Sequence, residues 1–147
     1  RIGEGICLAY DLPYLWGIED MDYLHSDIFT LKAQVLEVKN KPSYPQGEFC
    51  INAFGDLPQY EDRGMRRRAL LAIGGADAGD ALKLIPRLEG VELIGFSSDH
   101  TIIDIEDCEK DIRPGDVLEF DLCYPTMLSL TCSPDVHRIY VDDHEKV

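Results

Sequence analysis

Apolar and polar residues alternate in several short segments of the chain, as they do in strands that bury one face. The longest alternating run carries four apolar residues on one face: Phe29, Leu31, Ala33 and Val35. The phase then slips by one residue, because Leu36 and Val38 are the next apolar pair. A slip of one residue inside a strand predicts a β-bulge.

Further apolar segments follow at intervals of about ten residues. Three of them alternate, at residues 103–105, 118–122 and 128–132, and four are short apolar runs, at residues 48–54, 69–73, 91–96 and 138–141. We therefore expect an all-β fold, either a closed barrel or a sandwich, and favour an antiparallel β-barrel-like domain of about eight strands. Helical spacing is confined to residues 78–88, so we expect at most one short helix.

The composition is that of one domain with its own core. The chain has 147 residues, of which 45% are hydrophobic, and this is enough to bury a core without disulfides or metals. Its net charge of −14 repels phosphate backbones, so we expect no nucleic-acid partner. No run approaches the ~18 apolar residues that a membrane span needs, so we expect no membrane partner either.

The five cysteines are scattered along the chain and include no C-x-x-C pair. This pattern is typical of reduced thiols rather than of a disulfide framework or a zinc site, so we expect no metal and a cytoplasmic location. There is no signal peptide, and the first residue is Arg1 rather than a methionine. We interpret the chain as a fragment or a processed product of a longer polypeptide.

Four polar stretches could carry chemistry, and each has a plain structural alternative. The glycines of residues 1–6 let backbone amides approach an anion, or they form a simple turn. Residues 39–55 contain two prolines and two glycines, so they fix the path of a binding loop or of a rigid hairpin connection. Four of the 14 basic residues lie within residues 63–68, either as a solvated face or as a seat for a carboxylate or an acidic partner.

The fourth stretch is Ser97-Ser98-Asp99-His100, between two apolar runs. We expect a tight turn here, capped by Asp99. A hydrolytic site is the alternative, although a catalytic triad is defined by spatial roles and not by adjacency in the sequence.

In order along the chain, these stretches resemble the C-terminal part of the ornithine racemase group of predicted amino-acid racemases, which are pyridoxal-phosphate (PLP) enzymes related to alanine racemase. The matching residues are Arg1-Ile2-Gly3-Glu4-Gly5-Ile6, Glu37-Val38-Lys39, Lys41-Pro42-Ser43, Gly47-Glu48, Ala53-Phe54-Gly55, Asp62-Arg63-Gly64, Arg67-Arg68-Ala69, Ile94-Gly95, Ser97-Ser98-Asp99-His100, Asp104, Gly115-Asp116 and Ser133-Pro134. They cover nearly the whole chain, and the ordered set is far more specific than any single motif.

The resemblance implies an isomerase that works as a homodimer on an amino-acid substrate with PLP as cofactor. Residues 1–10 would be the last strand of an upstream PLP-binding α/β barrel. Residues 11–147 would be a C-terminal β domain that completes the partner subunit's active site and forms much of the dimer interface. The lysine that anchors PLP would lie upstream of Arg1, so we expect the isolated chain to be inactive.

The resemblance also assigns roles to single residues. Arg1 would meet the pyridine nitrogen of PLP, and the backbone amides of Gly3 and Glu4 would contact its phosphate. Ser98 and Asp99 fall where alanine racemases have a Met-Asp pair near the substrate carboxylate, so Asp99 matches the family and Ser98 does not.

Two positions depart from the family's pattern. Alanine racemases use a tyrosine from the partner's β domain as a catalytic base, and the position is matched here by Phe54, whose ring has no exchangeable proton. The candidates for that role are Tyr44, Asn52 and Tyr60. Asp135 stands close to a phosphate-contacting tyrosine of the relatives, where its charge would repel a phosphate.

These departures leave an alternative open, in which the chain is a non-catalytic β-barrel module for dimerisation or interaction whose parent has lost racemase activity.

Overall fold

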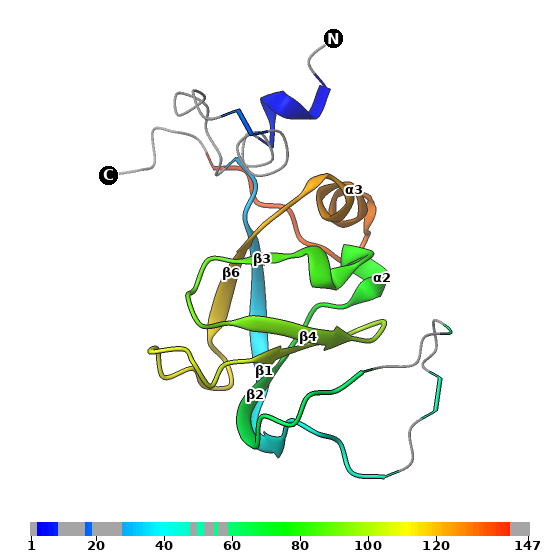
Figure 1. Cartoon of the computed structure of the whole chain (residues 1–147). Coiled ribbons are helices and arrows are strands. Elements are labelled where there is room, and N and C mark those ends of the chain that lie inside the picture. Colours follow the sequence, from blue (N-terminus) through cyan, green and yellow to red (C-terminus); the bar gives the residue numbers. More distant parts are fainter. Residues whose placement is uncertain are drawn as a thin grey trace.

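The computed structural model of the chain describes residues 3–8, 17–18, 28–47, 50–51, 55 and 59–141. In this part of the chain, six strands form one antiparallel sheet in the order β3-β6-β1-β2-β5-β4, which curls into a nearly closed barrel (Figure 1). The strands are β1 (Leu31–Pro42), β2 (Met65–Leu71), β3 (Ile85–Pro86), β4 (Glu92–Phe96), β5 (Thr101–Asp104) and β6 (Val117–Asp121). The expected antiparallel, barrel-like fold is confirmed.

The bulge expected in the first long strand is confirmed and shapes the sheet. The register of β1 against β2 shifts between Val35 and Glu37. On the N-terminal side of the shift, Leu31–Gln34 pair with β6, and on the C-terminal side β1 pairs with β2 as far as Pro42. One strand therefore belongs to both halves of the barrel, because the extra residue bends it between them.

The barrel encloses one apolar core. The strands β1, β2, β5 and β6 contribute alternate side chains to it, as a period of two predicts. The largest fully buried apolar side chains are Phe120, Leu71, Ile103, Ile105, Ile112 and Val35.

Two segments differ from the expected pattern, and a third is not tested. Residues 128–132 form the end of helix α3 (Tyr124–Cys132), not a strand, and Leu128 is exposed while Thr126 and Leu130 are buried at helical spacing. The capping box between Cys123 and Thr126 starts this helix. Residues 138–141 lie in no strand, and residues 48–49 and 52–54 fall outside the described residues.

The short helix expected over residues 78–88 is replaced by three shorter elements. Helix α2 covers Gly75–Ala78, the 3-10 helix η2 covers Ala81–Lys83, and β3 begins at Ile85. Helices α2 and α3 lie side by side (Figure 1), and their residues Ala78 and Leu130 belong to the core.

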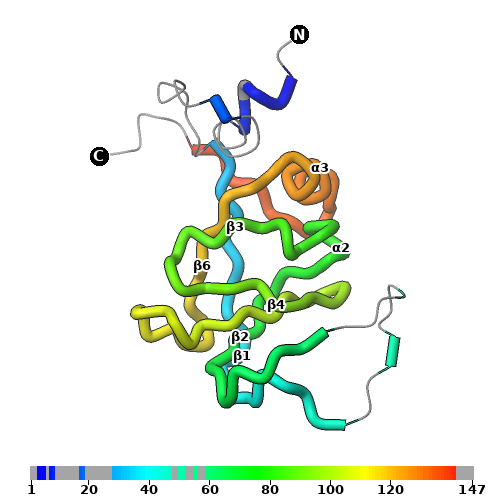
Figure 2. Tube along the Cα trace, viewed as in Figure 1, coloured from blue at the N-terminus to red at the C-terminus, as the bar shows by residue number. Residues whose placement is uncertain are grey.

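The described part of residues 1–10 contains a 3-10 helix, η1 (Gly3–Ile6), where the last strand of an upstream barrel was expected. The carbonyl of Glu4 accepts the N–H groups of Cys7 and Leu8, at 2.8 and 2.9 Å, and so curls this segment. Figure 2 shows η1, in blue, outside the barrel. The assignment of residues 1–10 to an upstream domain stays a prediction.

Candidate functional site

The polar stretch at residues 97–100 forms the turn of the β4–β5 hairpin. The N–H of Ser97 donates to the carbonyl of His100 at 2.8 Å, and the N–H of His100 donates to the Ser97 hydroxyl at 3.2 Å. The expected tight turn is confirmed, but its cap is Ser97 and not Asp99. The Asp99 carboxylate instead accepts a hydrogen bond from the Ser98 hydroxyl at 2.8 Å, and both side chains are exposed.

Helix α2 fixes the backbone of this turn. The N–H groups in the first turn of a helix have no acceptor within the helix. Here the N–H of Gly75 donates to the carbonyl of Ser97 at 2.8 Å, and that of Ala76 to the carbonyl of Ser98 at 2.9 Å. The turn is therefore held through its backbone, while the side chains of Ser98 and Asp99 stay exposed.

Two glycines make this contact possible. A Cβ built at Gly74 would lie 2.4 Å from the Ser98 carbonyl oxygen and 2.5 Å from the His100 nitrogen. A Cβ at Gly75 would lie 2.8 Å from the ring of Phe96. We did not single out this pair from the sequence, although two glycines directly after the apolar run of β2 are a signal of close backbone approach. We call Gly74, Gly75 and residues 97–100 the glycine end of β2.

The far side of α2 is tied to the segment that follows α3. The buried Ser133 hydroxyl donates to the Asp77 carboxylate at 2.6 Å and accepts the N–H of Asp135 at 3.2 Å. The turn, α2 and this segment are thus joined in one series of contacts. Ser133, which matches the racemase pattern together with Pro134, therefore has a structural role here: it binds this segment to α2.

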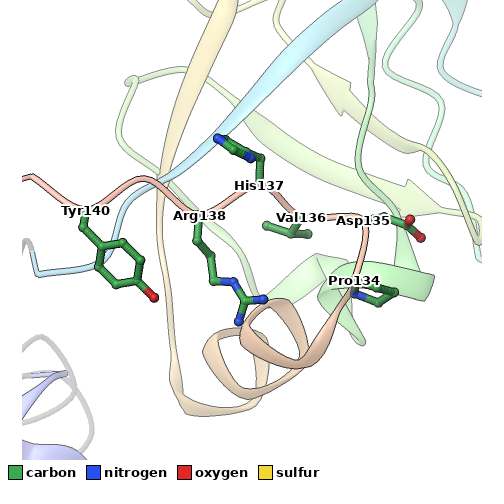
Figure 3. A pocket seen from close by; sticks show the side chains of 6 residues that line it. All are labelled: Pro134, Asp135, Val136, His137, Arg138 and Tyr140. Carbon is green, nitrogen blue, oxygen red and sulfur yellow. The ribbon is translucent and has the colours of Figure 1, made fainter.

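An open hollow lies along the same segment, lined by Pro134, Asp135, Val136, His137, Arg138 and Tyr140. Figure 3 shows these side chains in a row, with Asp135 and Tyr140 at its two ends and Arg138 directed toward α3. The Arg138 guanidinium donates to the carbonyl of Thr131 at 2.9 Å.

At its other end, β2 carries Arg66, Arg67 and Arg68, and Arg63 lies two residues before the strand; their partners are in the same chain. The Arg66 guanidinium donates twice to the Asp104 carboxylate, at 3.0 Å each, and also pairs with Asp107. Arg63 pairs with Glu92 at 2.9 Å. We call Arg63–Arg68 and these carboxylates the arginine end of β2.

The two remaining arginines bind backbone carbonyls. Arg67 donates to the carbonyl of Ile112 at 2.7 Å and pairs with Asp111 at 2.8 Å. Arg68 donates to the carbonyl of Ser43 at 3.2 Å, and its buried Nε has no hydrogen-bond partner among the described residues. Three of the four arginines are therefore compensated by carboxylates of the domain itself, which accounts for the cluster as a network of internal ion pairs.

Asp104 is the buried centre of this network, with 1% of its side chain exposed. Burial acts to raise the pKa of this carboxyl. The hydrogen bonds from Arg66 and from the N–H of Glu106, together with the charges of Arg66 and Arg63, outweigh burial and lower the pKa below its ordinary value. The hydrogen bond to Asp104 in turn raises the pKa of Arg66, so both partners are charged at neutral pH.

Two of the candidate bases lie where the chain leaves and re-enters the barrel between β1 and β2. Buried Ser43 closes this connection: its N–H donates to the carbonyl of Gly64 at 2.8 Å, and its hydroxyl accepts the N–H of Arg63 at 2.6 Å. The rings of Tyr44 and Tyr60 meet edge to face, with their centroids 6.5 Å apart.

The candidate residues therefore fall into two groups. Tyr44 follows Pro42, which is paired with Met65, whereas the turn with Ser98 and Asp99 precedes Thr101, which is paired with Leu71. The six residue-to-residue steps from Met65 to Leu71, the ends of the seven-residue β2, correspond to about 20 Å of strand. The structure thus brings Tyr44 and Tyr60 together, and Ser98 and Asp99 together, at opposite ends of β2.

The remaining candidates are placed only in part. Gly3 and Glu4 lie in η1, where Gly3 has a left-handed φ of +64° and a Cβ added to it would meet no atom of the described residues within 4 Å. Arg1 and Asn52 lie outside the described residues, as does Phe54.

The described part of the chain offers no metal site, since no three His, Cys, Asp or Glu side chains are grouped to hold an ion there. All five cysteines are free thiols, three half-buried and two exposed. Among the described residues, no helix is long and apolar enough to cross a membrane.

The likeness of the fold to a known structure defines its class. The alanine racemase of Oenococcus oeni matches 85% of this chain with a TM-score of 0.55 and 16% sequence identity, and the match covers 39% of that protein. The chain thus has the β fold of part of an alanine racemase. No protein-family model matches it.

Comparison with sequence relatives narrows the family further than the likeness of fold does. The chain is 41% identical over 128 residues to the ornithine racemase of Acetoanaerobium sticklandii, and this alignment covers 87% of the chain and 35% of the relative. It is 39% identical over 140 residues to the lysine racemase of Thermotoga maritima, which covers 95% of the chain and 38% of the relative. The chain is homologous to these racemases and spans little more than a third of their length.

Proposed function

We propose that the chain is the C-terminal β domain of a PLP-dependent amino-acid racemase, which completes the active site of a partner subunit in a homodimer. The observation that carries this proposal is the 39–41% identity to two racemases over nearly the whole chain. Their names give different substrates, ornithine and lysine, but the same reaction. Racemisation is therefore the function that both relatives support.

The glycine end of β2 fits the role of a ligand-facing surface. Ser98 and Asp99 are exposed, yet α2 holds the backbone that carries them. A group that is positioned by backbone contacts but not used in packing is available to a substrate. We propose that Ser98 and Asp99 face the substrate in the partner subunit's active site.

The backbone of Gly3 and Glu4 is suited to contact a phosphate. Because no atom of the described residues lies within 4 Å of a Cβ built at Gly3, we propose that its backbone and that of Glu4 approach the phosphate of PLP. The Glu4 carboxylate would be repelled there, so this residue would act through its N–H. PLP would supply the electron withdrawal that makes the α-hydrogen of the amino acid acidic. The protein must then remove and return that proton.

A proton carrier on the face opposite the PLP lysine is still needed, since phenylalanine at position 54 holds no exchangeable proton. We propose Tyr44 or Tyr60 for this role rather than Asn52, because a phenol can exchange a proton and an amide is a poor base. Since the tyrosines and the turn at residues 97–100 lie at opposite ends of β2, this proposal requires the connection between β1 and β2 to extend toward that turn when both act on one substrate. Tyr44 and Tyr60 are 45% and 44% exposed, so both are accessible to a partner subunit.

The test is α-hydrogen exchange by the full-length protein that contains this chain. With PLP in deuterated water, we expect loss of the α-hydrogen NMR signal of L-ornithine or L-lysine, with L-alanine and L-serine as comparison substrates. The 147-residue chain alone should show no exchange. A full-length protein that binds no PLP and exchanges none of these amino acids would contradict the proposal and favour the non-catalytic dimerisation or interaction module.

Replacing the two tyrosines tests the proton carrier separately. Tyr44→Phe and Tyr60→Phe keep the ring contact and remove only the hydroxyl. The variant that lacks the base should lose exchange by about 100-fold or more, while the other should stay active. Full activity in both variants would exclude both tyrosines.

A further inference from the structure

Gly74 packs directly against the backbone of the turn at residues 97–100. We propose that Gly74 and Gly75 are positioning residues, which set where Ser98 and Asp99 stand relative to the substrate. This inference rests on the proposed racemase function and adds residues that do not touch the substrate themselves.

The need for glycine at position 74 comes from space and not from backbone conformation. Gly74 has φ −145° and ψ −165°, an extended conformation that any residue adopts. The three atoms nearest to an added Cβ all belong to the backbone of the turn, at 2.4 to 2.6 Å. Backbone atoms cannot rotate away as a side chain does, so a methyl group at this position must displace the turn.

Gly75 has a milder constraint. Its added Cβ would meet the ring of Phe96 at 2.8 Å, and a ring can shift. Its N–H still binds the Ser97 carbonyl, so the residue contributes mainly through its backbone. The two glycines therefore predict a graded series, in which Gly74→Ala moves the turn more than Gly75→Ala.

Other hydrogen bonds next to the turn limit how far it can move as a whole. Directly after it, the buried Thr101 hydroxyl donates to the carbonyl of Ile73 at 2.7 Å. Behind α2, Asp77 is held by Ser133. The turn is thus clamped against the chain on both sides of Gly74, so a displacement appears at its exposed tip, where Ser98 and Asp99 stand.

The chain offers a matched control in the same hairpin. Gly95 lies in β4 close to the turn, and a Cβ added to it would meet no atom within 4 Å. Gly95→Ala therefore makes the same chemical change without the collision.

The experiment compares Gly74→Ala, Gly75→Ala and Gly95→Ala in the full-length racemase. We expect Gly74→Ala to lower kcat/KM by about 10- to 100-fold, mostly through KM, since a displacement of about 1 Å at a substrate contact has effects of this size. Gly75→Ala should have an intermediate effect, and Gly95→Ala should stay within about twofold of the wild type. Faster hydrogen exchange of the peptide that contains residues 97–100 should accompany the loss in Gly74→Ala.

A double-mutant cycle distinguishes positioning from a general loss of structure. If Gly74 acts through the turn, Gly74→Ala should change KM by less than about twofold in an Asp99→Ala background. A full effect in that background, or a wild-type KM in Gly74→Ala, would overturn the inference while the racemase function stands. A wild-type protein without racemase activity would instead overturn the proposed function, and hydrogen exchange would still report whether Gly74 holds the turn.

Discussion

The two ends of β2 are built in different ways. At the arginine end, charged side chains hold the strands together, with buried Asp104 and half-buried Arg66 as the central pair. At the glycine end, backbone groups hold a turn, and the side chains of Ser98 and Asp99 are left exposed. The first arrangement uses its polar side chains for the fold, whereas the second keeps them available for a ligand.

Because of this difference, the arginine end should govern the stability of the domain, and the glycine end should govern the position of Ser98 and Asp99. A buried ion pair is sensitive to the loss of one partner, because the other charge then remains in a poor solvent. A turn held by N–H to carbonyl bonds is insensitive to most changes in its own side chains. We therefore expect mutations at the arginine end to unfold the domain and mutations at the glycine end to alter activity.

The largest expected effect is that of Asp104→Ala. The Asp104 side chain is 1% exposed, and its removal leaves the half-buried Arg66 with the exposed Asp107 as its one remaining partner in the described part of the chain. We expect a loss of about 3 kcal/mol in the free energy of unfolding, measured by urea denaturation followed by circular dichroism. Asp111→Ala is the control, since that carboxylate is exposed and pairs with Arg67 and Arg113, and its loss should be much smaller. Equal losses would refute a special role for the buried pair.

The second prediction concerns pH. The pKa of Asp104 is lowered from its ordinary value of 3.8, so its contribution to stability is present above that value and is lost as the pH falls through the lower, folded-state pKa. The free energy of unfolding should therefore decrease as the pH falls from about 5 toward 3, and the decrease should be smaller in Asp104→Asn. The remaining decrease reports other carboxyls whose pKa is also lowered, such as Asp111 and Glu119. A pH profile identical to that of the wild type would rule out Asp104 as a source.

The contrast between the two ends also explains what the sequence could predict. The alternation around Val35 and Phe120 identified two strands and a bulge, because burial on one face acts on each strand locally. Residues 128–132 were misread, since Leu128, Leu130 and Cys132 alternate by chance. The helix there depends on a cap by Cys123, which is not among the usual capping residues.

The two ends of β2 were harder to predict, because the residues that contact each other there are distant in the sequence. The ion pair of Arg66 with Asp104 spans 38 positions, and it was invisible until the register of β2 and β5 was known. The turn at residues 97–100 was found from its polar residues, but its support by Gly74 was not, since a glycine pair does not indicate what approaches it. Sequence analysis thus identified the exposed tip and missed the backbone that holds it.

A smaller effect is expected for Ser133→Ala, which tests the support behind the glycine end. The variant removes the hydrogen bond from the buried hydroxyl to Asp77 and leaves the N–H of Asp135 without its acceptor. We expect a loss of about 1 kcal/mol in urea denaturation. Thr131→Ala is the matched control, because its exposed hydroxyl bonds only to carbonyls of its own helix, and its effect should stay within about 0.5 kcal/mol. A neutral Ser133→Ala would mean that α2 does not depend on this tie.

The smallest effect on stability is expected for Ser98→Ala, and it is the sharpest test of the contrast. The Ser98 side chain is exposed and bonds only to exposed Asp99, so its removal should change the free energy of unfolding by no more than about 0.5 kcal/mol. Thr101→Val, three residues further along, removes a buried hydroxyl that the Ile73 carbonyl needs and should cost about 1–2 kcal/mol. In the full-length racemase the order should reverse, with Ser98→Ala lowering kcat/KM more than Thr101→Val does. If Ser98→Ala destabilises the domain as much as Thr101→Val and leaves kcat/KM unchanged, the exposed tip belongs to the fold, and the glycine end does not face a substrate.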